Sequence, residues 1–157
     1  MDDRTRAATY EDVTRVAQLL EEEGVEYALI GGYALALQGI VRLTEDVDIL
    51  VEPSLENSRR WVRALSKLPD GAAKELVGDE TLHEELYAIR INDEFTVDVM
   101  NSASGLSWTD LAPYRRRIDG IQVMSLEGLL RMKSHGRLKD QADAEMIRKA
   151  LGIPGDG

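Results

Sequence analysis

The segment from Leu29 to Glu52 constrains this chain most, because it joins a glycine pair to two alternating aspartates. It reads LIGGYALALQGIVRLTEDVDILVE, with one apolar run ending at Gly31-Gly32 and Asp46 and Asp48 entering a second. Residues two apart on a β-strand face the same side, so the aspartates project together with Cα atoms roughly 6.6 Å apart. A divalent cation relieves their repulsion, and glycines before a helix suit a phosphate. The segment predicts a site for metal-bound nucleotide, although the aspartates taken alone also suit a solvated edge strand.

Periodicity along the rest of the chain predicts one α/β domain. Helices are expected over 9–24, 33–38, 53–68, 125–133 and 139–151, and strands over 25–30, 44–51, 82–91, 95–100 and a hairpin at 117–123. A short strand is expected within 71–78. With 43% hydrophobic and 31% charged residues among 157, the chain suits a single soluble domain over 9–151, with flexible ends at 1–8 and 152–157.

Three features favour a cytoplasmic location. The chain begins Met1-Asp2-Asp3, without the basic and apolar segments of a signal peptide. No apolar run approaches the length that spans a membrane. Cysteine is absent, which excludes disulfides and thiolate metal sites and fits a reducing compartment.

Charge is divided unevenly along the chain. The net charge is −10, yet residues 1–105 carry −12 and residues 106–157 carry +2. The second part contains the triplet Arg115-Arg116-Arg117, which suits either RNA and nucleotide phosphates or plain surface charge on a hairpin. The positive balance permits a polyanionic partner there, but solvated helix faces of mixed sign are the favoured explanation.

A lysine and two aspartates stand out on the last two predicted helices. Lys133 falls where the apolar stripe of its helix predicts another apolar residue. Either its stem covers the core while the ammonium reaches solvent, or the ammonium points at an anion. Asp140 and Asp143 are either partners of the helix dipole and of nearby basic residues, or members of a site.

The glycine and aspartate pattern resembles the nucleotidyltransferases of the DNA polymerase β superfamily. Here Gly31-Gly32 is followed by 13 residues and then Asp46-Val47-Asp48. The segments GGYALALQG and RLTEDVDILV are most similar to those of small bacterial nucleotidyltransferases related to the AbiEii-type toxins of toxin–antitoxin systems. That family needs a third acidic residue on a neighbouring strand, which Asp98 in FTVDVM matches.

A second part of the resemblance lies towards the C-terminus. SLEGLLRMKSHGRLKDQADAEMI is similar to the Lys-then-Asp helical pair of the toxin branch, and Lys133 with Asp140 or Asp143 matches that pair. This match favours the interpretation in which Lys133 points at an anion.

The resemblance implies a fold, a reaction and roles for these residues. The fold is α/β (α+β), of the nucleotidyltransferase type, with a small mixed sheet, helices packed on one side and the two aspartate-bearing strands adjacent. The reaction moves a nucleoside monophosphate from an NTP to an acceptor hydroxyl, with Mg²⁺ or Mn²⁺ as cofactor. Metal ligands are then Asp46, Asp48 and Asp98, and the nucleotide is bound by Gly31, Gly32, Arg42, Thr44, Lys133, Asp140 and Asp143, with Lys133 also counted as catalytic.

Three function classes remain open from the sequence. The first is a toxin-like enzyme that modifies RNA, in particular tRNA, and has a cognate antitoxin protein as partner. The second is a nucleotidyltransferase acting on a small molecule, such as an aminoglycoside, or on a partner protein. The third is a catalytically silent module that binds nucleotide or another protein. The basic balance of 106–157 favours the first, overall acidity favours the second, and three carboxylates speak against the third.

Overall fold

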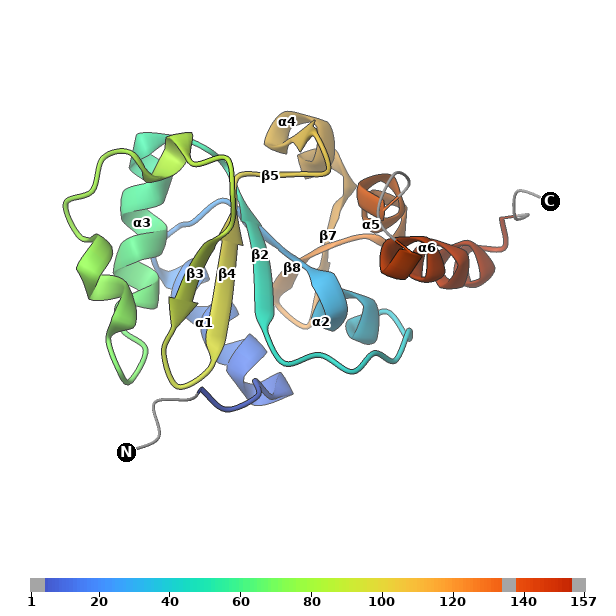
Figure 1. Cartoon of the computed structure of the whole chain (residues 1–157), viewed down its shortest axis with the longest axis horizontal. Coiled ribbons are helices and arrows are strands. Elements are labelled where there is room, and N and C mark those ends of the chain that lie inside the picture. Colours follow the sequence, from blue (N-terminus) through green and yellow to red (C-terminus); the bar gives the residue numbers. More distant parts are fainter. Residues whose placement is uncertain (1–4, 134–137, 154–157) are drawn as a thin grey trace.

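A six-stranded mixed sheet forms the centre of the molecule (Figure 1), in the order β3-β4-β2-β1-β8-β7. The computed structural model describes residues 5–133 and 138–153. The strands are β1 (Tyr27–Ile30), β2 (Val47–Val51), β3 (Ile89–Asn92), β4 (Thr96–Met100), β7 (Arg115–Ile118) and β8 (Ile121–Met124), and a separate small hairpin pairs β5 (Ser102–Ala103) with β6 (Leu106–Ser107). The pairs β2–β4 and β1–β8 are parallel and the other three are antiparallel, so the expected mixed sheet is confirmed.

Helices surround this sheet (Figure 1). They are α1 (Tyr10–Glu22), α2 (Gly31–Leu37), α3 (Leu55–Leu65), α4 (Trp108–Leu111), α5 (Leu126–Lys133) and α6 (Leu138–Leu151), with 3₁₀ turns η1 (Ala72–Leu76), η2 (Leu82–Glu84) and η3 (Ala112–Tyr114). Helices α1 and α3 pack together as the layer on one side of the sheet, where Val13 and Val16 meet Leu29 and Ile49. None of the helices in these described ranges is long and apolar enough to cross a membrane.

Alternation along β2 decides which side chains enter the core and which reach the site. Val47, Ile49 and Val51 are fully buried, and Ile49 faces α1. Asp48 therefore points to the opposite face of the sheet, because successive side chains on a strand alternate. The acidic site thus lies on the side that α1 and α3 leave uncovered.

Local signals account for most helix boundaries. Thr9 caps α1 in a reciprocal capping box with Asp12, which satisfies backbone N–H groups at the start of the helix. Ser54 caps α3 in the same position by accepting from the N–H of Asn57. The buried Asn57 amide also bonds backbone atoms of Glu26 and Glu52, so α3 is tied to the ends of β1 and β2.

The strand predicted over 44–51 is shorter than expected. It begins only at Val47, and residues 38–46 form an irregular loop. The carbonyl of Glu45 accepts from the N–H of Ala8, and the Thr44 hydroxyl donates to the carbonyl of Asp46, so these groups are used outside the sheet. Arg42 and Thr44 are therefore loop residues, and the strand predicted over 44–51 is wrong over its first three residues, 44–46.

Two other stretches differ from their predictions. The strand expected over 82–91 starts only at Ile89, because the Asn101 amide binds the carbonyls of Leu82 and Glu85 and holds that part in a 3₁₀ turn. The strand expected within 71–78 is also a 3₁₀ turn. There the buried Asp93 carboxylate accepts from the N–H groups of Asp70 and Ala72.

The N-terminal segment is more firmly held than the sequence predicts. Arg6 donates its backbone N–H to the carbonyl of Glu94, and its guanidinium pairs with Asp12. Ala8 is buried, and its carbonyl accepts from the Tyr33 hydroxyl. Residues 5–8 therefore belong to the packed domain. At the other end α6 stops at Leu151, and the tail expected beyond it falls largely outside the described residues.

Candidate active site

Two carboxylates face each other across the parallel pair β2–β4. Asp48 on β2 is in register with Asp98 on β4, and their side chains share one face because directly paired residues do. Asp46 comes two residues before Asp48, just ahead of the strand. Asp98 is buried, with 7% of its surface exposed, while the Asp46 side chain is 37% exposed. The three carboxylates thus gather at one place, two of them largely out of water.

This gathering makes ionisation costly. Burial raises the pKa of Asp48 to about 7, and the negative charges of Asp98 and Asp46 add to the effect. Burial also raises the pKa of Asp46, with a further contribution from Asp98. At neutral pH the cluster therefore favours bound positive charge.

A basic side chain that was not identified from the sequence already contacts this carboxylate cluster. Arg90 on β3 pairs with Asp98, with Nε–Oδ1 and Nη2–Oδ2 distances of 3.0 and 3.1 Å. Its Nη2 also lies 3.5 Å from Asp46 Oδ2. In the structure the hairpin pairs Asn92 with Thr96, so Arg90 lies opposite Asp98, whereas strands predicted to end at 91 and to restart at 95 give another register.

The two glycines are required by close packing against the site. Gly31 opens α2 with φ of +73°, and a Cβ there would overlap the Oδ2 atom of Asp48. A Cβ on Gly32 would lie 2.6 Å from the Cβ of Thr44. The helix predicted to begin at Tyr33 begins two residues earlier, at Gly31. Because the two glycines have no side chains, Asp48 and Thr44 can lie against its first turn.

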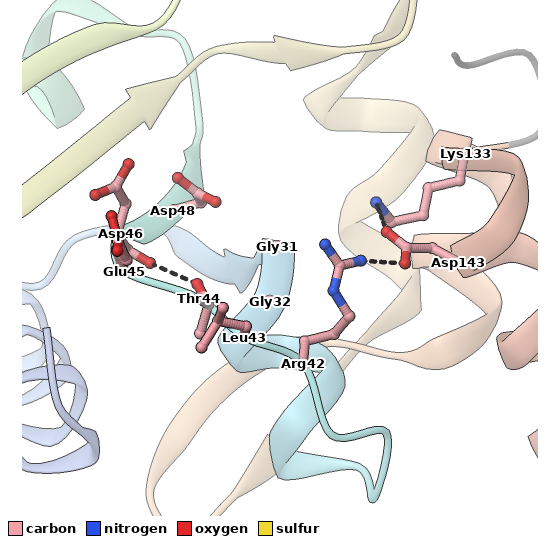
Figure 2. Close-up of a pocket in the computed structure, with 10 residues that line it drawn as sticks. All are labelled: Gly31, Gly32, Arg42, Leu43, Thr44, Glu45, Asp46, Asp48, Lys133 and Asp143. Carbon is pink, nitrogen blue, oxygen red and sulfur yellow. Dashed lines mark hydrogen bonds and ion pairs between the residues drawn. The ribbon is translucent and has the colours of Figure 1, made fainter. Parts of the chain in front are cut away.

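A buried carboxylate holds two cations on the far side of α2 (Figure 2). Asp143 on α6 is 3% exposed and pairs with Arg42 through Oδ1 and with Lys133 through Oδ2, the latter at 3.0 Å. Burial opposes ionisation of Asp143, but hydrogen bonds and charge from Lys133 and Arg42 outweigh it and lower its pKa. The anion that Lys133 contacts is the carboxylate of Asp143. The side chain of Asp140, the other candidate, lies outside the described residues.

The acidic and basic groups line one cleft of about 630 Å³. Figure 2 shows Asp46 and Asp48 at one end, Arg42 and Lys133 at the other, and the start of α2 between them. The lining residues are Gly31, Gly32, Arg42, Leu43, Thr44, Glu45, Asp46, Asp48, Lys133 and Asp143. Asp98 adjoins this cleft from the next strand, behind Asp48. The cleft thus offers a negative end for a metal and a positive end for an anion.

The carboxylates suit a divalent cation in chemistry but are not preformed around one. No group of three or more His, Cys, Asp or Glu side chains in residues 5–133 and 141–153 is arranged to hold a metal. The guanidinium of Arg90 contacts both oxygens of Asp98. Oxygen ligands and concentrated negative charge are what Mg²⁺ and Mn²⁺ prefer, so the three carboxylates fit these ions in chemistry.

The arginine triplet lies away from this cleft. Strand β7 is the sheet edge, separated from β2 by β8 and β1. Arg115 stacks on Trp108 and pairs with Glu26, and Arg117 pairs with Glu21. None of the three arginines is among the lining residues. Arg115 and Arg117 are therefore engaged in contacts within the domain.

Comparison with known proteins supports the fold. No protein-family model matches the chain, and no curated protein matches it. Among solved structures, the chain is similar to "a putative nucleotidyltransferase (TM1012) from Thermotoga maritima", with a TM-score of 0.56 and 20% sequence identity. The match covers 90% of this chain and 91% of the Thermotoga chain. The expected nucleotidyltransferase-type fold is therefore shown, over nearly the whole of both chains.

Proposed function

We propose that this protein is a metal-dependent nucleotidyltransferase that moves a nucleoside monophosphate from an NTP to an acceptor hydroxyl. One observation carries the proposal: a single cleft has carboxylates at one end and paired cations at the other, with a glycine-started helix between them. A metal–triphosphate complex has the matching charge pattern. The structural likeness to the Thermotoga protein supports this proposal.

The positive end is proposed to hold the triphosphate. Arg42 and Lys133 line the cleft with 18% and 15% of their side chains exposed, so both are partly removed from water. Charge-assisted hydrogen bonds to phosphate are stronger in such a setting. Asp143 keeps both cations in place, and the backbone N–H groups of Gly31 and Gly32 offer further donors, since the first turn of a helix leaves them unpaired. The volume of about 630 Å³ lies within the range of small-molecule sites.

The negative end is proposed to hold the metal. Asp46 and Asp48 are the ligands that face the cleft, and Asp98 is the third carboxylate behind them. Bound there, a divalent cation would supply charge neutralisation on the phosphates and lower the pKa of the attacking hydroxyl. The chain itself orients the triphosphate so that its α-phosphorus lies near the carboxylates. The acceptor oxygen then bonds to that phosphorus, the bond to the β-phosphate oxygen breaks, and pyrophosphate leaves.

Two acceptor classes are proposed, with different support. RNA, modified by a toxin-like enzyme with a cognate antitoxin, rests on the resemblance to the AbiEii-type branch and on the positive balance of residues 106–157. A small molecule or a protein is favoured by the structure of the arginine triplet, because Arg115 and Arg117 are engaged with glutamates and stand outside the cleft. The charge of −10 also disfavours a polyanion.

The acceptor experiment offers all classes to one protein. The four NTPs, each labelled at the α-phosphate, are supplied with Mg²⁺ or Mn²⁺ to total RNA, aminoglycosides and lysate proteins. If RNA is the acceptor, labelling should weaken steeply as salt rises. A plot of log affinity against log salt concentration should then have a slope of about −0.7 for each phosphate contacted. A small acceptor predicts little salt dependence. Absence of label in every fraction, with each NTP and either metal, would contradict the proposed function.

A further inference from the structure

Arg90 is the one strong basic contact of the carboxylate cluster in the described part of the chain, and it comes from outside the cleft. It lies on the edge strand β3, opposite Asp98, and its side chain is 60% exposed. From there it spans β4 to meet both oxygens of Asp98 and one oxygen of Asp46. Its partners are two of the three proposed metal ligands.

The contacts of Arg90 compete with a metal for the same atoms. A carboxylate has two oxygens, and the two-pronged pairing uses both of those on Asp98. The guanidinium also places one unit of positive charge where a divalent cation would bring two. Metal and guanidinium therefore repel each other and draw on one set of lone pairs.

The Arg90 side chain can move into solvent when it is displaced. Because its side chain is 60% exposed, leaving Asp98 moves the guanidinium into water without burying or uncovering a core. Arg42 and Lys133 differ in this respect, since both are mostly buried against Asp143. The pairing of β3 with β4 also does not depend on the Arg90 side chain, because four residue pairs join the two strands through the backbone.

We propose that Arg90 is a resident, displaceable cation of the carboxylate cluster, which neutralises Asp98 and Asp46 without metal and sets how tightly a divalent cation binds. This inference rests on the proposed function and adds a positioning residue to it. With metal bound, the guanidinium leaves Asp98 and turns to solvent.

The experiment measures metal binding directly rather than turnover. Mn²⁺ is titrated into the full-length protein and followed by electron paramagnetic resonance, with Mg²⁺ in calorimetry as the second probe. Arg90→Gln removes the competing charge, so Mn²⁺ should bind roughly tenfold tighter, because the metal no longer has to break the charge-assisted pairing of the guanidinium with Asp98 before it binds. Arg90→Lys keeps the charge without the two-pronged geometry and should lie between the two. Arg59→Gln is the matched control, because Arg59 is 53% exposed and pairs with the exposed Glu80 at the surface.

A nuclear magnetic resonance signal reports the displacement itself. The Nε–H of Arg90 donates to Asp98, so its resonance, identified by its loss in Arg90→Gln, should move on saturation with Mg²⁺. Mn²⁺ binding that Arg90→Gln leaves unchanged or weakens would overturn the role of Arg90 while leaving the proposed function standing. If neither the wild type nor any variant binds Mn²⁺ or Mg²⁺, the metal-dependent function and this inference fail together.

Discussion

Replacing Asp48 by Asn should stabilise the metal-free protein, although it removes a proposed metal ligand. The pKa of Asp48 is raised to about 7 from an ordinary value of 3.8, mainly by burial and then by the charges of Asp98 and Asp46. One pKa unit corresponds to about 1.4 kcal/mol, so the ionised form costs at most about 4 kcal/mol of folding free energy. Relaxation around the carboxylates reduces this figure, and we expect a gain of about 1–3 kcal/mol for Asp48→Asn at pH 8.

The sign of the pH dependence follows from the direction of the shift. The folded protein binds the Asp48 proton more tightly than the unfolded chain, so wild-type stability falls as pH rises from about 4 to about 7. Asn has no such titration. The advantage of the Asn variant should therefore be largest at pH 8, shrink through pH 7 and vanish near pH 4.

Urea unfolding in the presence of a chelator, at pH 5, 6, 7 and 8, measures this difference. Asp70→Asn, which removes a charge from an exposed turn, is the control for the change in net charge. Added Mg²⁺ should stabilise the wild type more than Asp48→Asn, because only the wild type keeps all three carboxylates. An Asn variant that is less stable than the wild type at pH 8 would refute the claim that buried charge accumulates at this cluster.

Two further substitutions test the packing of the cleft. Gly32→Ala should lose about 1–3 kcal/mol of stability in urea unfolding, since its Cβ would lie 2.6 Å from that of Thr44, and adding Thr44→Gly should restore it. Asp143→Ala should lose about 3 kcal/mol, because it leaves the partly buried Arg42 and Lys133 without their shared anion. In the wild type the stabilisation from the Asp143 carboxylate should disappear as pH falls below about 4, because the pKa of Asp143 is lowered. If Gly32→Ala or Asp143→Ala left the stability unchanged, the packing described would be contradicted.

Most of the fold follows from local patterns in the sequence. The caps at Thr9 and Ser54 and the turn at Asp119-Gly120 mark element boundaries through short-range hydrogen bonds and backbone preference. The boundaries that failed depend on distant partners. The Asn101 amide holds the 3₁₀ turn η2, and the N–H of Ala8 donates to the carbonyl of Glu45. No local sequence pattern predicts either contact.

The site divides in the same way between local and distant relations. Asp46 and Asp48 are two residues apart, so strand alternation is enough to bring them together. Asp98 joins them only through the parallel pairing of β2 with β4, which depends on strand order and which the resemblance implied. Arg90 went unrecognised because its place opposite Asp98 requires the exact turn between β3 and β4, which pairs Asn92 with Thr96. Arg42 and Asp143 were both predicted to bind the nucleotide. Their ion pair was not predicted, because Arg42 contacts Asp143 from a loop.

The central claim is nucleotidyl transfer, and the position of the label tests it most directly. The protein is incubated with Mg²⁺, a cell extract as acceptor source and an NTP labelled at either the α- or the γ-phosphate. We predict that only the α-label enters the acceptor, while the γ-label is released in pyrophosphate. Asp46→Asn and Asp98→Asn, shown to be folded by their melting curves, should lower this transfer at least ~100-fold. Transfer of the γ-label to the acceptor, or equal α-labelling by the wild type and both variants, would contradict the account.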